Sequence, residues 1–207
     1  MSIAATQVGQ AFGNYQLERE LGQGGMGTVY LAKDSGLNRY VALKILRSDL
    51  GDDPSFSRKF LEEVEATASL AHPNIIRVFT LGEQEGRLYL VMEHLDEPSL
   101  ENRMDKQTKV SEREVLEIGI GIASALQFAH EETGLIHRDI KPSNILATQH
   151  DDVAVPKVID FGIAKATEGR LTDLTVYTEL HQFIGTPAYM SPEQAEMSGL
   201  DIDTRSD

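Results

Sequence analysis

Apolar and polar positions alternate in short runs through the first ninety-five residues. The runs contain many Val, Ile, Leu and Tyr residues and are separated by turns with Gly or Asn, which is typical of strands. The expected strands are 15–21, 28–34, 39–46, 75–83 and 87–95. Between the third and fourth runs, residues 52–71 begin with Asp and Pro and continue with apolar side chains at helical spacing. The pattern predicts a β-rich part with one helix.

The spacing of apolar residues changes from that of strands to that of helices after "DEPS" at residues 96–99. Ser111 and Glu114 form a Ser-x-x-Glu capping box, which predicts the start of a helix over 111–132. Its apolar stripe consists of Val115, Ile118, Ile122, Ala125 and Ala129. We therefore predict an α+β chain with a loose leader over residues 1–14, a β-rich part that ends near Leu95 and a helix-rich part from residue 96.

Composition narrows the class of protein. The 207 residues are 41% hydrophobic and 25% charged, which is ordinary for a globular domain. They contain no Cys, which excludes disulfides and thiolate metal sites and fits a cytoplasmic setting. The net charge of −14 argues against general binding of nucleic acid and indicates a solvated acidic surface. No apolar run has membrane-spanning length, and the first residues do not resemble a secretory signal.

Three of the four glycines in "LGQGGMGTVYLA", between the first two strands, follow the G-x-G-x-x-G spacing. Gly22, Gly24 and Gly27 would let a hairpin backbone approach phosphates closely. A purely structural turn explains this pattern equally well when it stands alone. The strand on each side does not match the strand-then-helix setting of a dinucleotide fingerprint.

"VALK" places Ala42 and Lys44 on one face of a strand, where a small residue and a cation suit a flat base and its phosphates. A lysine on an edge strand is the alternative. On the 52–71 helix, Glu63 is the one charge in an otherwise largely apolar stripe, so it needs a cation, and Lys44 is the natural candidate. The alternative is a solvated Glu63 at the edge of the stripe.

Polar side chains are concentrated in "GLIHRDIKPSNIL", between apolar segments. Asp139 can accept a hydroxyl proton, Lys141 can neutralise a transferring phosphoryl group, and Asn144 offers a neutral oxygen to a divalent metal. In "KVIDFG", Asp160 ends a short apolar strand and supplies a carboxylate for Mg²⁺.

The order of these motifs, followed by "GTPAYMSPEQA", resembles the signature set of protein kinases. The likeness runs from about Tyr15 to Asp207 and is greatest to bacterial eukaryotic-like (Hanks-type) serine/threonine kinases. It implies a bilobal fold. Residues 15–95 would form an N-lobe with a five-stranded antiparallel sheet and one helix, and residues 96–207 an incomplete, mostly helical C-lobe.

The resemblance also implies a role for each matching residue. The three glycines would cover the phosphates of ATP, and Lys44, paired with Glu63, would hold the α- and β-phosphates. Asp139 would orient and deprotonate the substrate hydroxyl, and Asn144 and Asp160 would bind Mg²⁺ or, as second choice, Mn²⁺. The remaining residues expected around the adenine are Val29, Ala42, Met92, Glu93, Leu95 and Leu146.

Other positions indicate serine/threonine specificity and regulation. A lysine at the position of Lys141 is the pattern of serine/threonine kinases. The resemblance also implies that Thr186 bonds to Asp139 and Lys141, which is again the serine/threonine version. Arg138 before Asp139 goes with activation-loop phosphorylation in this family. The candidate phosphosites are Thr172, Thr175 and Thr178, of which we favour the last two; ordinary loop threonines remain an equal alternative.

The sequence departs from the family pattern in three places. Glu97-Pro98 stands where glycines are common in the family, and the segment between Asn144 and Asp160 is a few residues longer than usual. In the family, "RSD" opens a long core helix, and later helices supply an arginine that pairs with the residue matching Glu193. In the family, the Asp that matches Asp207 hydrogen-bonds the backbone of the catalytic loop. Because we expect the chain to be cut there, we expect Asp207 to be solvated and poorly ordered.

The expected function is transfer of the γ-phosphate of ATP to serine or threonine hydroxyls of proteins, with self-association for autophosphorylation. The alternative is that these 207 residues form an inactive nucleotide-binding or interaction module. A small-molecule kinase fits less well, because "GTPAYMSPE" resembles a peptide-substrate loop.

Overall fold

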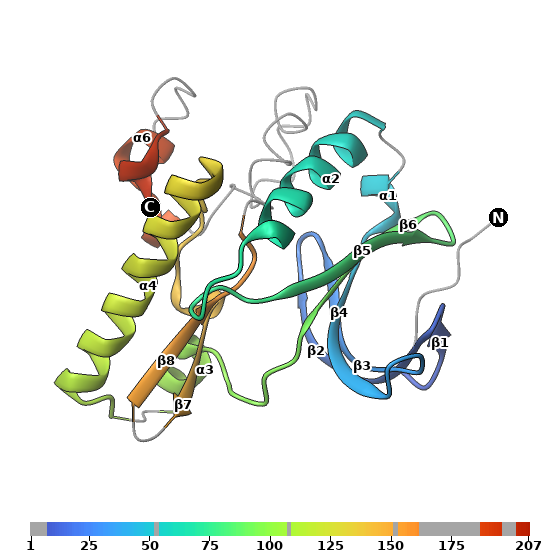
Figure 1. Cartoon of the computed structure of the whole chain (residues 1–207), viewed down its shortest axis with the longest axis horizontal. Coiled ribbons are helices and arrows are strands. Elements are labelled where there is room, and N and C mark those ends of the chain that lie inside the picture. Colours follow the sequence, from blue (N-terminus) through green and yellow to red (C-terminus); the bar gives the residue numbers. More distant parts are fainter. Residues whose placement is uncertain (1–7, 52–53, 107–108, 151–152, 162–186, 196–201) are drawn as a thin grey trace. The chain divides into compact units, whose positions relative to one another are not determined.

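The computed structural model describes residues 8–51, 54–106, 109–150, 153–161, 187–195 and 202–207 (Figure 1). The chain forms two compact units. Unit 1 consists of Met1–Leu61 and Arg77–His94, and unit 2 of Glu62–Ile76 and Leu95–Asp207.

Unit 1 is built on an antiparallel sheet with six strands among its described residues, in the order β1-β2-β3-β4-β6-β5. The strands are β1 (Ala11–Phe12), β2 (Tyr15–Gly24), β3 (Gly27–Asp34), β4 (Arg39–Leu46), β5 (Val78–Gln84) and β6 (Arg87–Glu93). The five expected strands are present. Val41 and Leu43 of β4 are fully buried on one face, as strand alternation requires, in a cluster with Leu17, Tyr30 and Val91.

The sixth strand, β1, lies in the segment expected to be a loose leader. Ala11 and Phe12 pair with Gln16 and Tyr15 of β2. Phe12 is buried, and its ring lies edge-on to that of Tyr89 at 5.5 Å between centroids. The expectation of a loose leader is therefore wrong for these two residues, because burial of one large aromatic side chain favours pairing of the strand that carries it.

The turns of the sheet follow from their residues. Between β3 and β4, the Asp34 carboxylate accepts hydrogen bonds from the amides of Gly36 and Leu37 at 3.0 and 3.2 Å. Between β5 and β6, Glu85 and Gly86 both have positive φ, as a two-residue hairpin turn of type I′ requires.

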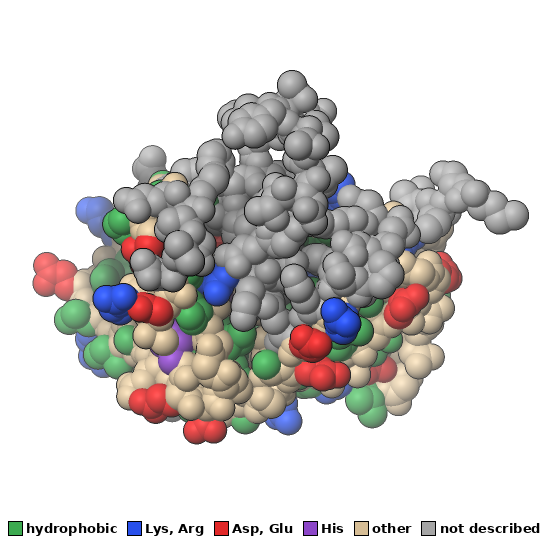
Figure 2. Space-filling view, turned by 90° about the horizontal axis from the view of Figure 1, so that it is seen from above, with side chains coloured by type: hydrophobic (Ala, Val, Ile, Leu, Met, Phe, Trp, Pro, Cys, Tyr) green, Lys and Arg blue, Asp and Glu red, His purple; other side chains and the backbone are tan. Residues whose placement is uncertain are grey.

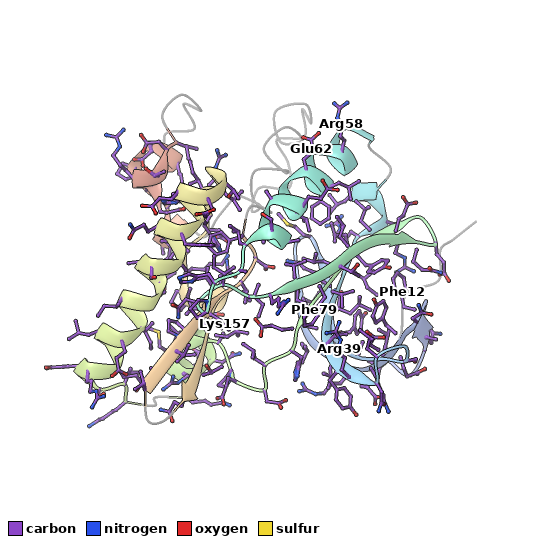
Figure 3. The ribbon with its side chains drawn as sticks, in the orientation of Figure 1. Phe12, Arg39, Arg58, Glu62, Phe79 and Lys157 are labelled. Atoms are coloured by element: carbon purple, nitrogen blue, oxygen red, sulfur yellow. The ribbon has the colours of Figure 1, made fainter. Side chains whose placement is uncertain are left out.

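Two features of the molecule's surface can be followed in the figures. In Figure 3, Arg39 lies beside Phe79, with its guanidinium carbon 3.8 Å from the ring centroid. In the view of Figure 2, acidic side chains are scattered rather than gathered into one patch. The scatter agrees with a solvated acidic surface.

Helix α1 (Ser48–Gly51) is a single turn, and α2 (Pro54–Ser69) is the expected long helix. The predicted stripe around Glu63 consists of Phe56, Phe60, Glu63, Thr67 and Leu70, and three of these residues, Phe60, Thr67 and Leu70, are buried. The side chains of the other two, Phe56 and Glu63, lie outside the described residues.

Unit 2 contains helices α3 (Leu100–Asp105), α4 (Glu112–Thr133) and α6 (Pro192–Ala195), the hairpin β7 (Ile145–His150) and β8 (Val153–Val158), and short 3₁₀ turns. The 3₁₀ turns are Pro142–Asn144, Pro187–Tyr189 and Thr204–Ser206. Buried Leu70, Ile75, Ala125, Ile145 and Val158 belong to one core cluster that connects α4 with the hairpin. The longer segment before Asp160 forms this hairpin.

The capping box of α4 is half formed. The Ser111 hydroxyl accepts a hydrogen bond from the Glu114 amide at 3.2 Å. The Glu114 carboxylate accepts a hydrogen bond from Arg103 of α3 at 2.5 Å, in place of the bond from the Ser111 amide that would complete the capping box. Gly134, in a left-handed conformation, ends the helix.

The predicted stripe of α4 is confirmed at Ile118, Ala125 and Ala129, which are buried, but Val115 is 55% exposed. The surface covered by the hairpin begins at Ile118, which packs with Ala147 and Ala154. No helix among the described residues is long and apolar enough to cross a membrane.

Gly121 allows close contact between α4 and β8. A Cβ atom there would lie 2.4 Å from Pro156 Cγ and 3.0 Å from Asn74 Nδ2, whereas a Cβ at Gly119, on the same helix, would meet nothing within 4 Å. The glycine at 121 is therefore required by packing, and the glycine at 119 is not.

We predict that Gly121→Ala lowers the free energy of unfolding by about 1–3 kcal/mol, because the added methyl overlaps the proline ring. The matched control Gly119→Ala should raise it by about 0.5–1 kcal/mol, because alanine is the better helix former. Urea unfolding of the two variants measures both values. Equal effects at the two positions would contradict the assignment.

Candidate active site

The polar loop of unit 2 is centred on Asp139. Its Oδ2 accepts a hydrogen bond from Asn144 Nδ2 at 3.0 Å and lies 2.8 Å from the ammonium of Lys141. Its Oδ1 is buried and has no hydrogen-bond partner among the described residues. A buried acceptor left unpaired costs about 1–3 kcal/mol, so Oδ1 is poised to receive a proton donor. The structure brings Asp139, Lys141 and Asn144 together, as the sequence predicted.

The side-chain amide of Asn144 is oriented by its contacts with Asp139. Its amide nitrogen donates to the backbone oxygen of Asp139 at 2.8 Å as well as to the carboxylate, which turns the amide oxygen away from both. The backbone oxygen of Asn144 accepts from the Ile159 amide at 3.0 Å, so Asp160 follows directly on a residue bonded to Asn144. An amide oxygen and a carboxylate are the hard ligands that Mg²⁺ prefers. The described residues contain no group of three or more His, Cys, Asp or Glu side chains that could hold a metal ion.

Two residues of this loop system have left-handed backbones. Arg138 has φ of 67° and Asp160 has φ of 63°. Such a conformation costs a residue other than glycine about 1–3 kcal/mol and is found at active sites when surrounding contacts enforce it.

Asp207 supplies one of these contacts, so the expectation of a solvated, poorly ordered Asp207 is wrong. Its side chain is 1% exposed. Its Oδ1 accepts from the Arg138 amide and its Oδ2 from the His137 amide, both at 2.7 Å, and Oδ2 also lies 2.9 Å from His130 Nε2. Two backbone amides and an imidazole replace the water that a carboxylate would otherwise need.

His137 is fully buried beneath the loop. Its Nε2 lies 2.9 Å from the Ile159 carbonyl, which can only accept, and its Nδ1 accepts from the Asp139 amide at 3.2 Å. These contacts require a neutral ring with the proton on Nε2. Burial lowers the pKa of His137, although the Ile159 carbonyl and the carboxylates of Asp207, Asp160 and Asp139 oppose the shift.

In unit 1, Lys44 lies on β4 between Val29 of β3 and Leu90 of β6 and is 7% exposed. A buried ammonium requires a charged or polar partner. The pairing with Glu63 stays a prediction, because the Glu63 side chain lies outside the described residues.

The residues expected around adenine occupy both units. In unit 1, Ala42 is in register with Met92, which is buried, and Val29 is half-buried. The Glu93 amide donates to the Arg77 carbonyl at 2.9 Å. In unit 2, Leu95 and Leu146 are half-buried. Their joint contact with a base stays a prediction.

The three glycines of the β2–β3 hairpin differ in what surrounds them. A Cβ at Gly27 would lie 2.2 Å from the Ile45 carbonyl oxygen and 2.9 Å from Leu46 Cα, so packing against β4 requires glycine there. At Gly22 and Gly24, a Cβ would meet no described atom within 4 Å. Packing therefore explains Gly27, whereas Gly22 and Gly24 leave room for a ligand.

Several predicted residues fall outside the described part of the chain. They are Thr186, the candidate phosphosites Thr172, Thr175 and Thr178, and Gly162. Glu193 is described, and its carboxylate accepts a hydrogen bond from the Ser206 hydroxyl at 2.5 Å.

Sequence reasoning missed His137, His130 and Gln194. The Gln194 amide donates to the Arg138 carbonyl at 2.7 Å. A histidine two residues before Asp139 was a signal for the first. No sequence signal identifies the other two, because their contacts join segments far apart along the chain.

The glycine hairpin and the buried lysine of unit 1, and the Asp–Lys–Asn loop of unit 2, each match a motif of protein kinases. The model of the family described as "Protein kinase domain" matches residues 15–207. The chain belongs to the protein kinase family.

The chain is similar to serine/threonine-protein kinases PknB of Mycobacterium leprae and PrkC of Bacillus subtilis. It is 43% identical to PknB over 197 residues, which are 93% of this chain and 30% of that protein. It is 41% identical to PrkC over 183 residues, 88% of this chain and 27% of that protein. Among solved structures, the kinase domain of Mycobacterium tuberculosis PknI superposes with a TM-score of 0.72 at 31% identity, over 98% of this chain and 73% of that domain. The chain thus spans about 30% of the length of its curated relatives.

We predict that Gly27→Ala lowers the free energy of unfolding by about 1–3 kcal/mol, because its methyl overlaps the β4 backbone. Gly24→Ala should change it by less than about 0.5 kcal/mol and should instead weaken binding of Mg·ATP. Thermal unfolding and nucleotide titration of both variants measure these effects. Equal destabilisation by the two substitutions would be the contrary result.

We predict that the chain loses stability as the pH falls below about 6.5, the ordinary pKa of histidine. The pKa of His137 is lowered in the folded state, so below pH 6.5 the unfolded chain binds a proton that the folded chain does not. The contribution of His137 to stability is therefore fully present above pH 6.5 and declines as the pH falls from there toward the lowered pKa. One such group contributes a slope of at most about 1.4 kcal/mol per pH unit.

Urea unfolding between pH 7.5 and 5.5 measures this slope. His137→Gln should flatten it. The pKa of His72 is also lowered, by burial and by Lys157, but this ring is only half-buried, so the control His72→Gln should flatten the slope less. An unchanged slope in His137→Gln would contradict the assignment.

Proposed function

We propose that this chain is the catalytic domain of an ATP-dependent serine/threonine protein kinase. The observation that carries the proposal is the divided environment of the Asp139 carboxylate. One oxygen is held by Lys141 and Asn144, and the other is buried without a partner among the described residues. This arrangement suits a base that receives the hydroxyl proton of a substrate.

In the proposed reaction, a serine or threonine oxygen of a protein forms a bond to the γ-phosphorus of ATP. The bond from that phosphorus to the bridging oxygen of ADP breaks, and Asp139 takes the hydroxyl proton. Lys141 lies beside Asp139 and would neutralise charge on the transferring group. Lys44 would hold the α- and β-phosphates, and Gly22 and Gly24 would let the hairpin backbone approach them.

Asn144 and Asp160 would hold Mg²⁺, which would supply positive charge to offset that of the phosphates. Mn²⁺ has the same ligand preference and is the second choice. The side-chain oxygens of these two residues fit such an ion, and the Asn144 amide is already oriented by its bonds to Asp139.

Serine and threonine are proposed as acceptors because Lys141 lies 2.8 Å from Asp139 and because the matched relatives carry that name. Since ATP is the phosphoryl donor, we propose that the domain acts in the cytoplasm. Phosphorylation in trans by a second copy is proposed for activation, with Thr175 and Thr178 as candidate acceptors.

We predict that Asp139→Asn lowers phosphate transfer to a serine- or threonine-containing protein by about 10²–10⁴-fold, because the proton acceptor is lost. Binding of Mg·ATP should persist. The control Asp203→Asn changes an exposed carboxylate that pairs with Arg205, so transfer should stay at the wild-type rate. Transfer of γ-³²P and a nucleotide titration measure the two quantities.

Undiminished transfer in Asp139→Asn would overturn the assignment. Nucleotide binding by the wild-type protein without any transfer would instead favour the nucleotide-binding module. The hydrogen bonds of Asp207 to the amides of His137 and Arg138 support the proposed catalytic function, because they hold the loop that carries Asp139.

A further inference from the structure

The peptide bond between Arg138 and Asp139 is held by side chains at both of its polar atoms. Gln194 Nε2 donates to its carbonyl oxygen at 2.7 Å, and His137 Nδ1 accepts from its amide at 3.2 Å. The preceding amide of Arg138 donates to Asp207 at 2.7 Å. The left-handed residue before the catalytic aspartate is thus fixed on each side.

The orientation of the Gln194 amide is itself determined. Its oxygen accepts from the Ser191 amide at 3.0 Å, so its nitrogen must face the Arg138 carbonyl. Both residues lie at the start of α6, in the "SPEQ" sequence, 53 to 56 positions along the chain from Arg138. Glutamine is the residue that both contacts require, since one partner is a donor and the other an acceptor.

The orientation of this peptide matters for the reaction. Rotation of this peptide plane would change ψ of Arg138, a residue whose φ of 67° already restricts it to a left-handed conformation. The same rotation would change φ of Asp139 and turn its carboxylate. Losses of about 10²-fold follow when a catalytic group is misplaced by about 1 Å.

We propose that Gln194 is a positioning residue for the proposed phosphotransfer: its amide locks the Arg138–Asp139 peptide and so fixes the direction of the Asp139 carboxylate. Gln194 acts through this peptide and touches no reacting atom. The inference rests on the proposed function, and it makes the geometry of Asp139 depend on the placement of residues 191–194.

The decisive variant is Gln194→Glu, which has nearly the same shape. A carboxylate can still accept from the Ser191 amide, but its second oxygen would face the Arg138 carbonyl oxygen and repel it. We expect kcat to fall by about 10- to 100-fold, with KM for Mg·ATP within about twofold of wild type. Gln194→Lys keeps a donor for the carbonyl and should retain a kcat closer to that of wild type.

A matched control tests the charge change alone. Gln16 on β2 also donates its amide to a backbone carbonyl, that of Gly9, at 2.9 Å. Gln16→Glu removes the same kind of bond and adds the same charge, so kcat should stay at the wild-type value. Thermal unfolding of each variant shows whether a loss of activity reflects global unfolding.

Hydrogen exchange at the Asp139 amide gives a readout that does not need activity. Exchange should be faster in Gln194→Glu than in wild type and unchanged in Gln16→Glu. If the wild-type protein transfers no phosphate, the proposed function fails, and this exchange comparison alone decides the positioning role. Faster exchange then supports it, and unchanged exchange overturns it. In an active protein, a wild-type kcat in Gln194→Glu overturns the proposal, as does a loss fully accounted for by unfolding.

Discussion

The Asp207 carboxylate and the backbone that it holds are the constraint on which the candidate active site depends. Arg138 is forced into a left-handed conformation, which an unsupported loop would not keep. Asp207 binds the amides of His137 and Arg138 and the ring of His130, and is almost entirely buried in doing so. A charge removed from water in this way is stable only because three donors surround it. Those contacts give the loop its shape.

The core of unit 2 gives this loop a rigid base. The turn after α2 is joined to β8 by backbone bonds, with the Val158 amide donating to the Asn74 carbonyl at 2.8 Å and the Ile76 amide to the Val158 carbonyl at 2.9 Å. The Asn74 side chain donates to the Pro156 carbonyl at 2.9 Å. Gly121 lets α4 approach this turn and β8 closely. The strand that leads to Asp160 is therefore fixed on two sides.

His137 connects the two parts of the loop system. Its Nε2 binds the carbonyl next to Asp160, its Nδ1 binds the amide of Asp139, and its ring lies against Phe161 with centroids 4.7 Å apart. One neutral, buried ring thus contacts both Asp139 and the carbonyl that precedes Asp160. Protonation of that ring would break the Asp139 contact, which is why burial and function require the same tautomer here.

The sequence by itself determined the strands, the long helices and the identity of the chemical groups. Strand alternation and helical spacing reflect local geometry, so the apolar pattern alone places Val41, Leu43, Ile118 and Ala125 on buried faces. Motif order was specific enough to indicate the family. Only the tertiary structure decided that Asp207 is buried, that Ala11 and Phe12 form a sixth strand, and that Gln194 contacts the Arg138 carbonyl. These depend on contacts between residues distant in sequence, and no local period or propensity encodes which partners meet.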